Sequence, residues 1–166
     1  QNIVRPAVRL VSDLQAAYMG SGIPYSVVSD DAGIWVGWAS AVDTHRLLLA
    51  QHFDANGQAP GAVNTVEEQT MGEVFRFSMA LDGNRLTFAW ISTMDGSPWH
   101  VTTLDTATGT HLSDQTLGLS LADCRVVQAV ALRPGLAVAC SALSGIGVAP
   151  LDANGNPVLS SGASLM

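Results

Sequence analysis

Three short segments of the chain share one order of residues: an apolar residue, then an aspartate, then a turn that ends in glycine. The segments are His52-Phe53-Asp54-Ala55-Asn56-Gly57, Thr103-Leu104-Asp105-Thr106-Ala107-Thr108-Gly109 and Pro150-Leu151-Asp152-Ala153-Asn154-Gly155. Asp105 follows Asp54 by 51 residues, and Asp152 follows Asp105 by 47 residues. A motif that returns at such a period is typical of proteins built from similar units stacked side by side.

A second marker lies upstream of each aspartate, in the same order every time. It is a turn followed by an apolar strand: Asp31-Ala32-Gly33 before Ile34–Trp38, Asp82-Gly83-Asn84 before Leu86–Trp90, and Arg133-Pro134-Gly135 before Leu136–Cys140. Trp38, Trp90 and Cys140 therefore occupy one place in the unit. Because this strand is the most continuously apolar of each unit, we expect it to be covered on both faces. We expect Trp38 and Trp90 to be buried at equivalent positions.

Each unit is expected to contain four strands, because short apolar runs bounded by Asp-Gly, Asn-Gly or Pro-Gly form hairpins. The expected strands are 25–29, 34–39, 47–53 and a weak one near 62–66; then 74–81, 86–92, 99–104 and 111–117; then 125–132, 136–142, 147–151 and a stretch from Val158. Four strands in about 45–50 residues match a propeller blade. The expected fold is all-β and propeller-like, with about three four-stranded blades over 25–73, 74–124 and 125–166. A β-sandwich of the same hairpins is the alternative.

Residues 1–24 depart from this pattern and have two interpretations. Apolar residues at Ala7, Leu10, Val11 and Leu14 fit helical spacing. The rival interpretation is a partial blade made of two short strands. Since closed propellers contain about 4–8 blades, three blades predict either self-association or further blades from the same or another chain.

Composition excludes several classes of partner. Apolar residues make up 48% and charged residues 13% of the 166 residues, and the formal charge is −7. All seven basic residues are arginine, so the chain lacks the basic surface that nucleic-acid binding requires. No apolar run is long enough for a transmembrane helix. Cys124 and Cys140 form either a disulfide or two buried thiols, and we expect them on adjacent antiparallel strands joined by the turn at 133–135.

These motifs resemble the bacterial extracellular β-propeller repeat proteins. In that family an Asp-Gly turn precedes an apolar strand ending in Trp, and an Asp-x-x-Gly turn follows the next strand. Here Trp38 is followed by Leu48-Leu49-Ala50-Gln51-His52-Phe53 and then by Asp54-Ala55-Asn56-Gly57. The resemblance covers roughly residues 25–162, and the third unit lacks the tryptophan. It implies export to the extracellular space or the cell surface, and it implies no single activity.

No catalytic, cofactor or metal site is predicted from the motifs. The Asp-Ala-Asn-Gly turns at Asp54 and Asp152 suggest calcium, but no late bidentate acid follows, so an Asx turn is favoured. Ser29-Asp30-Asp31-Ala32-Gly33 matches the aspartate box of sialidase-like propellers only in part. The four histidines share no metal-ligand spacing and are expected to be solvated or hydrogen-bonded.

Trp35 and Trp99 are the candidate contacts for a ligand or partner. Trp35 faces away from Trp38 across the strand, and Trp99 follows a loop. An aromatic ring at a loop edge stacks on a sugar or anchors a protein, whereas packing between blades is the structural alternative. We expect a non-catalytic module for protein binding or structural assembly. The alternatives are a carbohydrate-binding propeller and a glycoside hydrolase-like enzyme.

Overall fold

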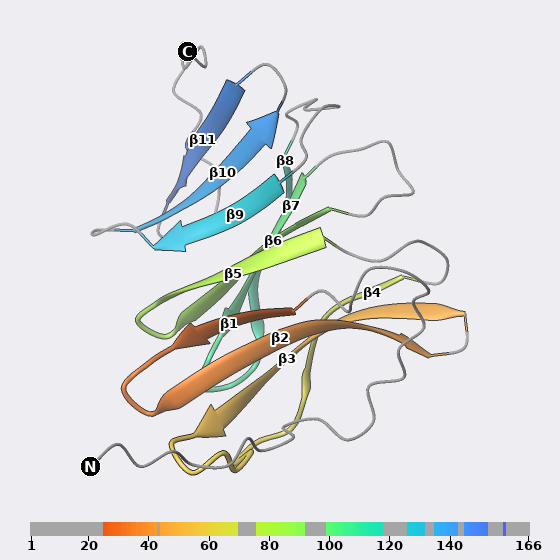
Figure 1. Cartoon of the computed structure of the whole chain (residues 1–166), viewed down its shortest axis with the longest axis vertical. Helices are drawn as coiled ribbons and strands as arrows, with labels where there is room; N and C mark the ends of the chain where they lie inside the picture. The colour runs from red at the N-terminus through yellow and green to blue at the C-terminus, as the bar shows by residue number, and fades with distance from the viewer. Residues whose placement is uncertain are drawn as a thin grey trace, which may run out of the picture.

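The computed structural model describes residues 25–42, 44–69, 76–91, 99–117, 126–131, 135–142, 145–152 and 158. In this part of the chain all regular structure is β, arranged as three separate antiparallel sheets (Figure 1). The all-β prediction is therefore confirmed. No helix in the described ranges has the length and apolar character needed to cross a membrane.

The strands follow the hairpins expected from the turn residues. The first sheet has the order β1 (Tyr25–Ser29), β2 (Gly33–Val42), β3 (His45–Asp54) and β4 (Asn64–Gln69). The second has β5 (Arg76–Asp82), β6 (Arg85–Ile91), β7 (Trp99–Asp105) and β8 (His111–Leu117). The third has β9 (Val126–Ala131), β10 (Leu136–Ala142) and β11 (Gly145–Leu151). Of the stretch expected from Val158 only that residue is described, and its N–H donates to the carbonyl of Pro150.

The strand registers place the three apolar strands in corresponding positions. Trp38 lies opposite Tyr25, Trp90 opposite Phe77, and Cys140 opposite Val127. Trp38 and Trp90 are 5% and 1% exposed. The prediction that both tryptophans are buried at equivalent positions is confirmed.

The three sheets meet through their first strands, since β1, β5 and β9 lie side by side (Figure 1). A serine joins each neighbouring pair. The N–H of Met79 in β5 donates to Ser26 Oγ in β1 at 3.2 Å, and the N–H of Ala129 in β9 donates to Ser78 Oγ in β5. Ser26 and Ser78 stand at corresponding places in their hairpins, so the second and third sheets are joined as the first and second are.

Two clusters of buried side chains fill the spaces between the sheets. The cluster between the first and second sheets contains large rings, among them Trp35, Phe88 and Trp90. The cluster between the second and third sheets is made of smaller side chains, such as Ala80, Ala89, Leu136 and Val138. β6 contributes to both clusters because its successive side chains point to opposite faces. The expectation that this strand is covered on both faces is confirmed.

Two expectations fall partly or wholly outside the described residues. Residues 1–24 belong to this group, so neither interpretation of that segment is tested. Cys124 also lies outside the described residues, so its expected position on a strand next to that of Cys140 is not tested. Cys140 lies in β10, which is antiparallel to β9, and its cross-strand neighbours are Val127 and Gly147.

Candidate functional site

Aspartate side chains close the turns of the first two sheets. Asp54 Oδ1 accepts the N–H groups of Asn56 at 2.8 Å and Gln58 at 2.9 Å. Asp105 Oδ1 accepts those of Ala107 at 2.8 Å and Thr108 at 3.0 Å. These contacts are Asx turns, in which the carboxylate satisfies the backbone donors of its own loop. The Asx-turn interpretation is confirmed for Asp54; the loop after Asp152 lies outside the described residues.

The turn hydrogen bonds favour the charged form of both carboxylates. The N–H of Gln58 contributes most to holding the pKa of Asp54 below its usual value, and the N–H of Thr108 does the same for the pKa of Asp105. A carboxylate that accepts backbone N–H groups loses those bonds in part when it is protonated. These two aspartates therefore act as structural anions of the turns.

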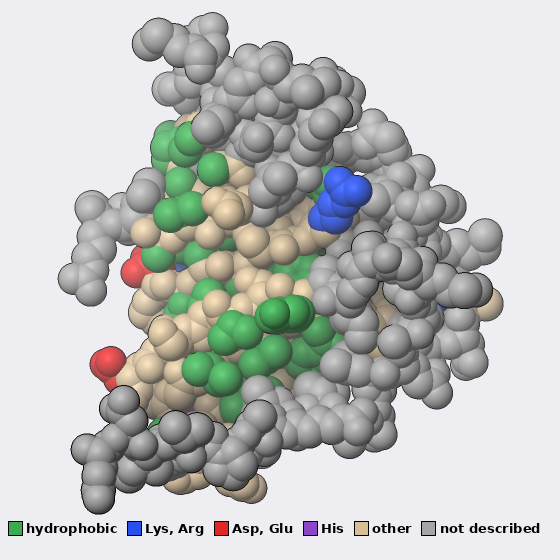
Figure 2. Space-filling model, viewed as in Figure 1, with side chains coloured by type: hydrophobic (Ala, Val, Ile, Leu, Met, Phe, Trp, Pro, Cys, Tyr) green, Lys and Arg blue, Asp and Glu red, His purple; other side chains and the backbone are tan. Residues whose placement is uncertain are grey.

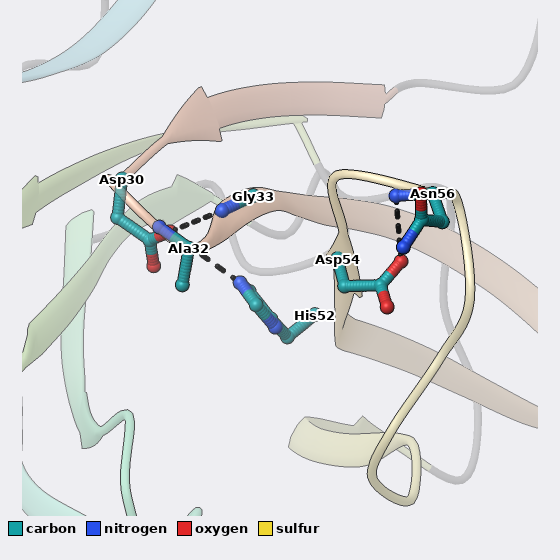
Figure 3. A network of polar contacts seen from close by, with 6 residues as sticks. All are labelled: Asp30, Ala32, Gly33, His52, Asp54 and Asn56. Atoms are coloured by element: carbon teal, nitrogen blue, oxygen red, sulfur yellow. Dashed lines mark hydrogen bonds and ion pairs between the residues drawn. The ribbon is translucent and has the colours of Figure 1, made fainter.

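Asp30 closes the turn between β1 and β2 and also approaches an imidazole. Asp30 Oδ1 accepts the N–H groups of Ala32 at 2.8 Å and Gly33 at 2.7 Å, and His52 Nε2 lies 3.5 Å from the same oxygen (Figure 3). Partial desolvation raises the pKa of Asp30, but the two N–H groups and His52 outweigh it and leave the pKa below its usual value. These contacts are all made by Oδ1, and Oδ2 accepts no hydrogen bond from the part of the chain that the structure describes.

Asp30 and His52 line a pocket of about 480 Å³ where the first and second sheets meet. One wall comes from the first sheet and its β3–β4 loop, and the other from the turn between β7 and β8. The lining residues are Asp30, Ala32, Trp35, His52, Pro60, Gly61, Ala62, Asn64, Thr106, Ala107, Thr108 and Gly109. A volume of this size is typical of small-molecule sites, which span about 300–1,000 Å³.

The close approach of the two sheets at this pocket requires a glycine. Gly109 has a φ of +71°, and a Cβ placed on it would lie 2.2 Å from Asn64 Oδ1 of the first sheet. Nearby, His111 Nε2 lies 3.1 Å from the carbonyl oxygen of Thr65. The turn at 106–109 is thus held against the start of β4, which fixes the shape of the pocket.

Trp35 lines the pocket and is 5% exposed. Its ring lies 5.2 Å from the His52 ring, tilted by 49°. Its indole Nε1 is buried, and no acceptor lies within hydrogen-bond distance among the described residues. A buried donor without an acceptor is costly and rare in proteins, which singles out Trp35 from the other core aromatics.

Of the two candidate contacts predicted from sequence, the structure describes the side chain of Trp35 but not that of Trp99. Trp35 belongs to the buried cluster between the first two sheets, which agrees with the structural alternative of packing between sheets, and it also borders the pocket. It offers no exposed ring face for stacking. Trp99 begins β7 opposite Leu117, and its side chain lies outside the described residues. Asp30 and His52 were not predicted as site residues, because their pairing depends on two strands separated by a turn.

Within the described ranges no group of three or more His, Cys, Asp or Glu side chains is close enough to hold a metal ion. His45 Nδ1 lies 2.6 Å from Glu68 Oε1, and His100 stacks on Trp90 with ring centroids 4.0 Å apart. These histidines have structural partners within their own sheets.

Comparison of the chain with models of protein families, with curated proteins and with solved structures finds no match in any of the three.

Proposed function

We propose that this chain is a non-catalytic structural module whose end sheets add further sheets of the same kind, supplied by a second copy of the chain. In this proposal the three sheets are propeller-like blades, and the assembly is extracellular or on the cell surface. The observation that carries the proposal is the repeated serine link between neighbouring sheets. The localisation rests on the resemblance alone, and protease treatment of intact cells would test it.

The first and second sheets each pack against the next sheet through one face, which we call the following face. The corresponding face of the third sheet carries similar side chains. Val130 in β9 corresponds to Val28 in β1 and Ala80 in β5, both of which pack toward the following sheet. Val130 is 38% exposed, and Val148 in β11 is 50% exposed. Val148 pairs with Ala139, so both valines lie on this following face.

The first sheet has exposed apolar side chains on its opposite, preceding face. Val27 corresponds to Met79, which packs toward the first sheet, and Tyr25 corresponds to Phe77. Tyr25 is 74% exposed and Val27 49% exposed. Figure 2 shows hydrophobic side chains gathered over the first sheet and again over the third.

These two surfaces are complementary in the way that the internal ones are. The following face of the first sheet packs on the preceding face of the second sheet. The following face of the second sheet packs on the preceding face of the third in the same way, and both contacts run through the first strands of the sheets. A second copy can repeat that relation by placing its first sheet on the third sheet of its neighbour. Such head-to-tail contacts produce rings when the rotation closes. An apolar surface of this kind on a lone chain also favours association.

Native mass spectrometry and light scattering on the full chain test the proposal. We expect the chain to form an oligomer and the double variant Val130→Glu, Val148→Glu to shift it to monomer. Leu112→Glu is the matched control, because Leu112 is 48% exposed but lies in the second sheet. Assembly should be unchanged in that variant. A chain that stays monomeric at every concentration, or a control that dissociates equally, would contradict the proposal.

A further inference from the structure

The side chains that join neighbouring sheets occupy one position of the first strand. Ser26 in β1 accepts the N–H of Met79 in β5, and Ser78 in β5 accepts the N–H of Ala129 in β9. Register against the second strands shows that the corresponding position of β9 is Gln128. Gln128 is exposed, and no further sheet follows it among the described residues. The joining position of the third sheet is therefore open to a partner.

A small residue lies across the hairpin from each joining position. It is Gly37 in the first sheet, Ala89 in the second and Ala139 in the third. A Cβ on Gly37 would lie 2.5 Å from Met79 Sδ of the following sheet, so the small residue makes room for that sheet. Ala89 is fully buried between the second and third sheets, whereas Ala139 is only partly buried. The third sheet thus keeps the space into which a following first strand fits.

The first sheet presents the matching donor at its open edge. Val27 in β1 corresponds to Met79 and Ala129, whose N–H groups are the donors within the chain. At the end of the same hairpin, the N–H of Asp30 donates to the carbonyl of Gly33. Inward and outward backbone groups alternate along an antiparallel pair, so the N–H and carbonyl of Val27 both point away from β2. Val27 is 49% exposed, and this outward N–H is available to a neighbouring sheet.

We infer that Gln128 of one copy accepts the N–H of Val27 in the next copy. The inference rests on the proposed assembly and adds the contact that sets its register. A carboxamide offers an acceptor and two donors, so Gln128 also donates to the outward carbonyl of Val27. Its amide oxygen lies two bonds further from the backbone than a serine hydroxyl, so it spans a wider junction than those within the chain.

Amide hydrogen exchange, followed by nuclear magnetic resonance of the full chain, tests the contact directly. The N–H of Val28 points inward to β2 and is the internal reference. We expect exchange of the Val27 amide to slow at least roughly tenfold between dilute and concentrated protein. The Val28 amide should be protected at both concentrations. A Val27 amide that exchanges equally fast in both samples, while the chain assembles, would overturn the inference.

Variants of both partners test the same bond in another way. Gln128→Ala removes the acceptor, and Val27→Pro removes the donor at an edge position where proline is tolerated. Each should raise the dissociation constant of self-association roughly fivefold, as expected for one hydrogen bond, when measured by sedimentation equilibrium. Gln115→Ala, at an exposed glutamine of the second sheet, should leave the constant unchanged. Val27→Ala keeps the N–H and should raise the constant less than Val27→Pro does.

The double variant Gln128→Ala, Val27→Pro shows whether the two groups bind each other. Either change alone removes the bond, so the combined loss should be no greater than the larger single loss, whereas independent sites give additive losses. Additive losses, or full assembly of Gln128→Ala, would refute the contact. If Val27→Pro unfolds the chain, loss of Val27 amide protection in Gln128→Ala replaces it as the test.

These outcomes are distinct from a failure of the proposed assembly. If Val130→Glu, Val148→Glu dissociates the oligomer but Gln128→Ala does not, the assembly stands and the Gln128 contact is wrong. A chain that stays monomeric at every concentration overturns both.

Discussion

Trp38 and Trp90 show how one sequence position is used differently in neighbouring sheets. Trp90 belongs to the large buried cluster, stacks on His100, and donates its indole N–H to Thr102 Oγ1 at 3.0 Å. Trp38 is also buried, but it points to the opposite side from Trp35 and belongs to neither cluster of described residues. The equivalence of the two residues therefore lies in backbone register and burial, and their neighbours differ.

Replacement of Trp90 should cost much of the stability of the chain. Trp90→Ala removes a side chain that is 1% exposed and leaves a cavity between two sheets. We expect a loss of about 3–5 kcal/mol in the free energy of unfolding. Trp90→Phe should cost less, because it retains the ring and loses the hydrogen bond to Thr102. Urea denaturation measures both, and a loss below about 1 kcal/mol for Trp90→Ala would contradict the assigned burial.

Asp105 should make the stability of the chain depend on pH. Its pKa lies below the usual 3.8 in the folded state, with the N–H of Thr108 as the largest cause. A group with a depressed folded pKa stabilises the fold above its unfolded pKa, and this contribution is lost as pH falls through the folded pKa. Asp105→Asn should therefore lower the urea midpoint at neutral pH and lower it less in acid below the usual pKa. An equal difference at both pH values would contradict the shift.

At the scale of strands, the turn residues made the hairpins predictable. Turns that end in glycine, at 31–33, 105–109 and 133–135, adjoin Tyr25–Ser29, His111–Leu117 and Leu136–Ala142, and these three strands have the expected bounds. β2 and β3 are longer than expected, because the polar residues Ser40, His45 and Arg46 interrupt the apolar pattern from which the strands were predicted. Local patterns report on pairing across a short turn, and hairpins are such pairings.

The contacts between sheets could not be predicted in the same way. Asn64 meets Gly109 across 45 residues, and the two approach closely because the glycine lacks a side chain. His52 reaches Asp30 only because β2 and β3 pair in the observed register. The pocket follows from such long-range contacts, so its residues were not recognised as a set. Trp35 alone was selected from sequence, since it lies across the strand from Trp38.

Gly37 in β2 allows the first two sheets to pack closely. A Cβ on this residue would lie 2.5 Å from Met79 Sδ and 3.0 Å from Phe88 Cε1 of the second sheet. Gly37→Ala should therefore lower the free energy of unfolding by about 1–3 kcal/mol through overpacking. Gly61→Ala is the control, because no atom lies within 4 Å of its Cβ. Thermal denaturation of the two variants gives the comparison, and equal midpoints would contradict the proposed close packing.

At the scale of the whole molecule, the two sheet junctions differ in the side chains that they bury. Rings of Trp35, Phe88 and Trp90 fill the first junction, while alanine, valine and leucine side chains fill the second. Large aromatic side chains bury more apolar surface and contribute more to stability. Since each sheet contacts mainly its neighbours, stability is expected to divide by junction, as it does in repeat proteins. The third sheet should therefore open more readily than the first two.

Amide hydrogen exchange measures this division sheet by sheet. We expect the amides of β6 and β7 to exchange only on global unfolding, and those of β9, β10 and β11 to exchange faster through local opening. Val138→Ala thins the second junction, where Val138 is 3% exposed, and should speed exchange in the third sheet while leaving β6 and β7 unchanged. Phe88→Leu weakens the first junction and should speed exchange in both the first and second sheets. If Val138→Ala instead accelerates all three sheets equally, the chain unfolds as one cooperative unit. In the assembly proposed above, a second copy docked on Val130 and Val148 would protect β9 to β11 and reduce the difference between sheets at high protein concentration, because binding stabilises only the state that presents the folded surface.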